Sequence, residues 1–188
     1  MDDVSTQLLR DTRLPQAAMP GQVQRVDVHD ARAGVVKLLV FCEPWCGQRW
    51  VSVTARRTTV DWAHPIKDLV DVRYPHAERR VLVINNVNTH GPAWLYEVVA
   101  PTEAKRFADK REIHPTPTHG SWRTMAEIEL SGLSRQCLHR RVPDAMTRIA
   151  EVPAWERRRN AAGGSINWRF TTADARIKLT KLYPAIQE

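Results

Sequence analysis

Residues 80–84 read RVLVI and give the clearest strand pattern in the chain, with the polar run NNVNTH following at 85–90. A short run rich in valine, leucine and isoleucine that ends in turn-forming residues is typical of a buried strand. Functional groups gather at the carboxyl ends of strands in open α/β sheets, so the polar run is a candidate site. From spacing alone, an asparagine-rich turn is the simpler interpretation.

Patterns on both sides of this strand predict a mixed fold. Residues 14–34 are expected to be an irregular connection because they contain several prolines and glycines. Further strands are expected at 37–43, 49–55 and 111–115. Helices are expected at 61–73, 92–109, 122–140, 143–160 and 171–182, with a break near Pro101 in the second. The expected caps are Asp61 for the first helix, Ser121 for the third, and Thr171 or Thr172 for the last. This order indicates an α/β fold with a mixed sheet.

The helix expected at 122–140 carries two glutamates beside an apolar stripe. Glu127 and Glu129 lie at opposite edges of this stripe, and periodicity does not choose between them as candidate site residues. Each is equally explained as a surface charge. The stripe consists of Ala126, Leu130, Leu133 and Cys137.

Length and composition describe an ordinary globular domain. The chain has 188 residues, of which 43% are hydrophobic and 26% charged. No apolar run approaches the roughly 18 residues that span a bilayer, and the polar N-terminus does not resemble a secretory signal, so a cytoplasmic protein with no membrane partner is expected. The pairs Cys42/Cys46 and His114/His119 have no second ligand pair at suitable spacing, so zinc is not expected.

Residues 135–181 carry the whole net charge of +7, with 11 Lys or Arg against 4 Asp or Glu. A basic segment of this kind attracts polyanions, of which nucleic acid is the common case, although a solvated helical face explains it as well. The candidate nucleic-acid-binding residues are Arg135, Arg140, Arg141, Arg157, Arg158 and Arg159.

Several blocks of sequence resemble bacterial mariner-like insertion-sequence transposases, which are DDE superfamily endonucleases. The blocks are HGSWRTMAEIELSGLSRQCLHRRVPD at 119–144, RRTTVDWAHPIKDLVDVRYPHAE at 56–78, VLVINNVNTH at 81–90, AWERRRN at 154–160 and INWRFTTADARIKLTKLYP at 166–184. They cover nearly the whole chain. The resemblance implies one catalytic domain over residues 1–188 with an RNase H-like fold, a mixed sheet flanked by helices.

The resemblance also implies a triad of acidic residues that holds two Mg²⁺ ions, one at the attacking and one at the leaving oxygen of a phosphoryl displacement. The run DDVSTQL makes Asp2 the first member, and RTMAE makes Glu127 the third. The second position, in INNVNTH, is Asn85 in place of the family's aspartate. Asp2 and Glu127 are the expected metal ligands. Because an amide brings no charge, weak Mg²⁺ binding and little cleavage are expected.

Other departures from the family pattern concern the ends of the domain and one helix. Only Met1 precedes Asp2, so the first strand is expected to be largely missing and the N-terminal helix-turn-helix region absent. Pro153 stands where a helix should continue, at a cost of about 3 kcal/mol. The expected function is DNA cleavage and strand transfer, impaired in this chain. The alternative is a non-catalytic remnant that binds nucleoid DNA nonspecifically, or that pairs with itself or with full-length transposase.

Overall fold

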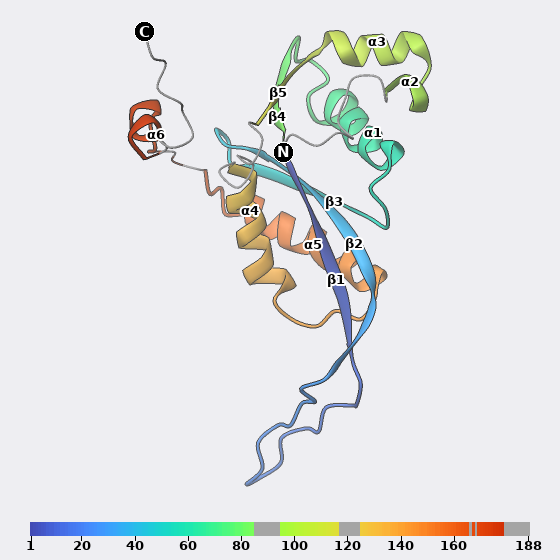
Figure 1. Ribbon diagram of the computed structural model, residues 1–188, viewed down its shortest axis with the longest axis vertical. Coiled ribbons are helices and arrows are strands. Elements are labelled where there is room, and N and C mark those ends of the chain that lie inside the picture. The colour runs from blue at the N-terminus through green and yellow to red at the C-terminus, as the bar shows by residue number, and fades with distance from the viewer. Residues whose placement is uncertain (85–94, 117–124, 166, 168, 179–188) are drawn as a thin grey trace, which may run out of the picture.

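An antiparallel and a parallel β-sheet, with helices around them, form the fold in the computed structural model (Figure 1). The model describes residues 1–84, 95–116, 125–165, 167 and 169–178. In the antiparallel sheet, β2 (Asp30–Glu43) lies between β1 (Asp2–Asp11) and β3 (Gln48–Thr54). In the parallel sheet, β4 (Arg80–Ile84) pairs with β5 (Arg111–Pro115). The predicted α/β class is therefore confirmed, whereas the strands expected in one mixed sheet form two separate sheets in the described residues.

Strand β1 corrects the expectation of a largely missing first strand. It runs for 10 residues and pairs with β2 along its length, from Asp2 opposite Val40 to Asp11 opposite Asp30. Its local sequence is a weak strand signal because most of its side chains are at least partly exposed. The ladder to β2, which sequence periodicity does not detect, holds it in place.

The hairpin of β2 and β3 separates two apolar cores. Successive side chains of a strand point to opposite faces. Leu38 and Val40 therefore pack with the helices on one face, while Leu39 and Phe41 pack into the other core. Phe41 also stacks on the Trp50 ring, with 5.2 Å between centroids. The core around Leu38 and Val40 includes α4 (Met125–Leu133) and α5 (Ala145–Ala161). The core around Leu39 and Phe41 includes α1 (Thr59–Asp68) and α3 (Pro101–Asp109).

The first helix starts earlier than predicted. Its N-cap is Thr58, not Asp61, because the two side chains form a reciprocal capping box: each accepts a hydrogen bond from the other's backbone N–H. The helix α1 then continues as a π-helical turn at Leu69–Arg73. The predicted break near Pro101 is confirmed, since α2 (Leu95–Val98) ends before α3 begins there.

The later helices differ from the predictions in detail. Helix α4 is continued by a π-helical turn at Ser134–Leu138, and the predicted cap Ser121 lies outside the described residues. Pro153 does not interrupt α5, which runs for 17 residues around it. The last helix, α6 (Thr172–Lys178), has Thr171 as its cap, because the Thr171 hydroxyl accepts from the Asp174 N–H.

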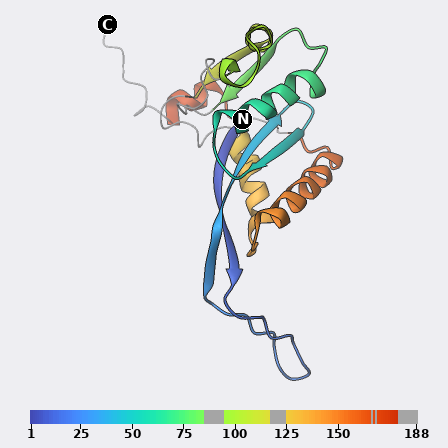
Figure 2. The same ribbon diagram turned by 90° about the vertical axis from the view of Figure 1, so that its right-hand side faces the viewer.

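The two sheets meet at the N-terminus of the chain. The Met1 ammonium group donates a hydrogen bond to the carbonyl of Val83 in β4, over 2.7 Å. The start of β1 therefore lies next to the end of β4. At its other end, the β1–β2 hairpin extends past the helices, and its connecting segment 12–29 projects from the body of the molecule (Figures 1 and 2).

Candidate metal and nucleic-acid site

Two carboxylates from distant parts of the sequence meet where β1 begins. Asp2 is the first residue of β1 and is only 2% exposed. Glu127 lies in the first turn of α4, which packs across β1 and β2, and is half-buried. The two carboxyl groups are joined by a hydrogen bond. The structure thus brings together the first and third predicted triad residues, although their catalytic role stays a prediction.

Burial and mutual contact change the titration of both groups. Burial raises the pKa of Asp2, although the N–H of Asp3, 2.8 Å from Oδ1, and the Met1 ammonium group oppose the rise. Burial also raises the pKa of Glu127, and the nearby Asp2 charge raises it further. Two carboxylates in contact repel each other unless a proton or a cation lies between them. The two groups therefore titrate as a coupled pair, with the pKa of each raised.

This donor set suits a small divalent cation. Carboxylate oxygens are the hard ligands that Mg²⁺ prefers, and a cation would relieve the repulsion between ionised Asp2 and Glu127. Within the described residues, no cluster of three or more His, Cys, Asp or Glu side chains is placed to hold a metal ion. The second triad position, Asn85, lies outside the described residues.

Glu129 has a different environment from Glu127, a distinction that periodicity left open. Its side chain is 1% exposed and forms an ion pair with Arg49 of β3, whose side chain is also 1% exposed. It is therefore not a surface charge. Sequence reasoning missed this pair, although strand alternation carried a signal: Arg49 shares the parity of Val51 and Val53, which face the core of α4 and α5.

The six candidate nucleic-acid-binding arginines are not equivalent. Arg157 and Arg158 on α5 are exposed, and neither makes an ion pair within the described part of the chain. Arg135 is exposed and donates to the Ser131 hydroxyl, 2.6 Å away. The others pair with acids of the chain itself: Arg140 with Glu151, Arg141 with Asp11, and Arg159 with Glu129.

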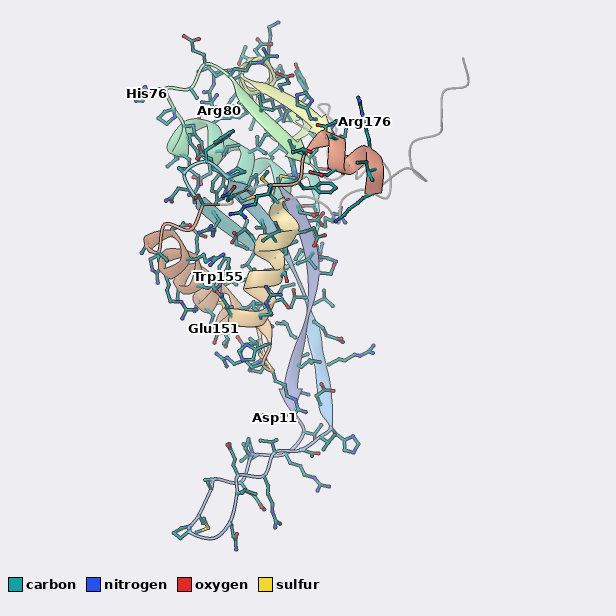
Figure 3. The ribbon with its side chains drawn as sticks, turned by 90° about the vertical axis from the view of Figure 1, so that its left-hand side faces the viewer. Asp11, His76, Arg80, Glu151, Trp155 and Arg176 are labelled. Atoms are coloured by element: carbon teal, nitrogen blue, oxygen red, sulfur yellow. The ribbon has the colours of Figure 1, made fainter. Side chains whose placement is uncertain are left out.

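A pocket of about 220 Å³ lies between α5 and the π-helical turn at Ser134–Leu138. Arg140 and Arg158 line it, together with Trp155, whose indole N–H donates to the Gln136 side chain. Figure 3 shows Glu151 and Trp155 side by side on α5. Of the two arginines that line the pocket, Arg140 is paired with Glu151. The guanidinium group of Arg158 is therefore the one available to a phosphate.

None of the helices that the structure describes has the length and apolar character needed to cross a membrane.

Comparison with models of protein families identifies the family of this chain. The family model of the DDE superfamily endonucleases matches residues 1–148, which include Asp2, Asn85 and Glu127. Neither characterised proteins nor solved structures give a match. Because the matched region is well over half of the 188 residues, the chain belongs to the DDE superfamily endonuclease family.

Proposed function

We propose that this chain is the catalytic domain of a bacterial mariner-like insertion-sequence transposase, and that Asn85 impairs its cleavage and strand transfer of DNA. Endonucleases of the DDE superfamily act on DNA and generally use divalent metal ions such as Mg²⁺. The observation that carries the proposal is the hydrogen-bonded pair of Asp2 and Glu127, a buried and a half-buried carboxyl whose pKa values are both raised. An RNase H-like arrangement within one domain, residues 1–188, is part of the proposal, and the antiparallel sheet followed by a parallel pair supports it.

Each residue of the proposed triad has a separate role. Asp2 and Glu127 would hold Mg²⁺, and the bound ion would supply Lewis-acid chemistry at a phosphate group. The Asp3 N–H keeps one oxygen of Asp2 oriented, and burial of Asp2 keeps competing water away from it. Asn85 supplies an amide oxygen without charge. Two carboxylates are then left to balance the charge of two divalent ions, so the second ion binds weakly.

DNA is the proposed partner, and the exposed face of α5 is the proposed contact. Arg157 and Arg158 are exposed there, and Arg135 lies on the neighbouring π-helical turn. Guanidinium groups bind phosphate oxygens through paired N–H donors, without reading the base sequence. Binding through this face is therefore nonspecific, and it places the protein at the bacterial nucleoid.

The second candidate is a non-catalytic protein that binds DNA nonspecifically, or that pairs with a second copy or with an intact transposase. The neutral side chain at position 85 favours it, because the triad then has only two acids. The two candidates make different predictions about metal-dependent cleavage but the same prediction about DNA affinity.

Nicking of supercoiled plasmid in Mn²⁺ or Mg²⁺ tests the proposal. The unmodified chain is compared with Asn85→Asp and with a matched Asn85→Asp/Glu127→Gln chain. Restoring the acid is expected to raise nicking by about 100-fold or more, the usual size of an electrostatic contact to a transition state. Adding Glu127→Gln is expected to abolish the gain.

Two other outcomes are informative. If Asn85→Asp binds the plasmid but does not nick it, the non-catalytic candidate is supported. If the unmodified chain nicks as fast as Asn85→Asp, position 85 is not part of the metal site and the assigned triad is wrong.

A further inference from the structure

Arg49 and Glu129 form an ion pair inside the molecule. Arg49 Nη2 donates a hydrogen bond to Glu129 Oε1 over 3.2 Å, and Arg49 Nε lies 3.0 Å from Oε2 as a charge contact without hydrogen-bond geometry. Both side chains are 1% exposed, so solvent does not screen the pair. The pair therefore ties α4 to β3 through one directional hydrogen bond and the attraction between the two charges.

The same guanidinium also holds the end of α5. Arg49 Nη1 donates to the Arg159 carbonyl over 3.0 Å, and Nη2 donates to the Gly164 carbonyl over 2.7 Å. The Asn160 side chain joins the backbone of Arg49 in both directions, accepting from its N–H at 3.0 Å and donating to its carbonyl at 2.7 Å. Arg159 Nε lies 3.5 Å from Glu129 Oε2. One buried residue thus connects β3, α4 and α5.

A buried ion pair of this kind is not needed for stability alone. Removing two charges from water costs several kcal/mol per ion, and well-packed apolar side chains of similar volume often serve as well or better. What apolar side chains do not supply is a directional contact. Because Glu129 is two residues after Glu127, their side chains leave α4 about 200° apart. Any rotation of α4 that releases Glu129 also moves Glu127 away from Asp2.

We propose that Arg49 and Glu129 are positioning residues for the candidate metal site: their ion pair sets the rotation of α4 that keeps Glu127 in contact with Asp2. The inference rests on the proposed function in treating Asp2 and Glu127 as metal ligands. Arg159 belongs to the same cluster, because it is a second cation beside Glu129. Its role is therefore to support this ion pair, and not to contact DNA as its position in the sequence predicted.

The test uses a variant that separates orientation from stability. In Arg49→Met/Glu129→Leu, both charges are removed together, so the core keeps its volume and no buried charge is left unpaired. The variant is expected to stay folded in the absence of urea, although loss of the Arg49 hydrogen bonds to the Arg159 and Gly164 carbonyls lowers its urea midpoint. Its affinity for Mn²⁺, measured by electron paramagnetic resonance of free Mn²⁺, is expected to fall about 10- to 100-fold, as when partners that orient metal ligands are lost. Both measurements are made in the natural chain and in the Asn85→Asp chain.

A matched control removes an ion pair elsewhere. Arg106 and Asp71 form a partly exposed pair, 2.8 Å apart, between α3 and the π-helical turn that follows α1. The variant Arg106→Gln/Asp71→Asn is expected to leave Mn²⁺ affinity unchanged. A folded Arg49→Met/Glu129→Leu chain with parental Mn²⁺ affinity would overturn the positioning role.

Hydrogen exchange tests whether the ion pair holds α4 in place, independently of metal binding. Backbone amides of Met125–Leu133 are expected to exchange faster in Arg49→Met/Glu129→Leu than in the parent, with or without metal. If no chain binds Mn²⁺, including Asn85→Asp, the proposed metal site fails, while exchange still decides whether the pair holds α4. Unchanged exchange in α4 would show that the pair does not set the position of this helix.

Discussion

Metal binding by this chain is expected to depend on pH, because a cation and a proton compete for Asp2 and Glu127. Burial raises the pKa of Asp2, and burial together with the Asp2 charge raises the pKa of Glu127. A divalent ion binds the form in which both groups are carboxylates. Binding therefore expels any proton that the pair holds.

The magnitude follows from the number of protons that the pair holds. In the pH range where the pair holds one proton, one proton is released for each ion bound, so affinity rises about tenfold per pH unit, or ~1.4 kcal/mol. Both shifts are upward, so this dependence extends above the ordinary carboxyl range near pH 4 and flattens once the pair is deprotonated. The raised pKa values also affect the free energy of unfolding. They stabilise the metal-free folded state at low pH, and this contribution is lost as the pH rises through them.

Titration calorimetry with Mn²⁺, in two buffers of different ionisation enthalpy, counts the released protons directly. The unmodified chain is expected to release protons on binding Mn²⁺ while the pair is protonated, and none once both groups are ionised. In Glu127→Gln, which keeps the shape but cannot share the proton, binding is expected to be weaker and nearly independent of pH above the Asp2 pKa. If the unmodified chain binds Mn²⁺ at low pH without releasing a proton, the two carboxyls do not form the site.

Three further predictions concern stability and DNA. Phe107→Ala empties a fully buried position in the core beside α3 and is expected to lower the free energy of unfolding by about 3–5 kcal/mol, measured in urea. Thr58→Ala removes one half of the α1 capping box and is expected to cost about 0.5–2 kcal/mol in the same assay. Arg157→Gln/Arg158→Gln is expected to weaken DNA binding and to lower the salt slope of log K by about 2, measured by fluorescence anisotropy. Arg141→Gln, whose guanidinium is held by Asp11, is the control and should leave that slope unchanged.

Local patterns predicted the elements whose stability is local. The strand β4 was predicted at its observed bounds, because a continuous apolar run between polar residues is a strong signal. Strand β1 was expected to be largely missing because only Met1 precedes Asp2, but it extends from Asp2 to Asp11 along β2. The cap of α1 was misassigned because Thr58 and Asp61 are both good capping residues, and only their reciprocal hydrogen bonds show which one begins the helix.

The candidate site was predictable to a similar extent. The likeness to transposases selected Asp2 and Glu127, and the structure places these two carboxyls in contact. Helical periodicity could not separate Glu127 from Glu129, because it records which residues are polar and not which partner each one meets. Arg49, which lies 80 residues before Glu129, is that partner. The arginine cluster shows the same limit, since charge alone did not distinguish exposed Arg158 from Arg159, which pairs with Glu129.

The projecting segment 12–29 makes the first strand separable from the rest of the chain. Cleavage after Arg25, an exposed site for trypsin, would yield a short fragment carrying Asp2 and a long fragment carrying Glu127. The ladder between β1 and β2 would still hold them together, since none of its pairs lies in that segment. The chain is therefore suited to fragment complementation: a synthetic peptide with Asp2→Asn could be exchanged for the native strand, so that one half of the site is varied while the other stays unchanged.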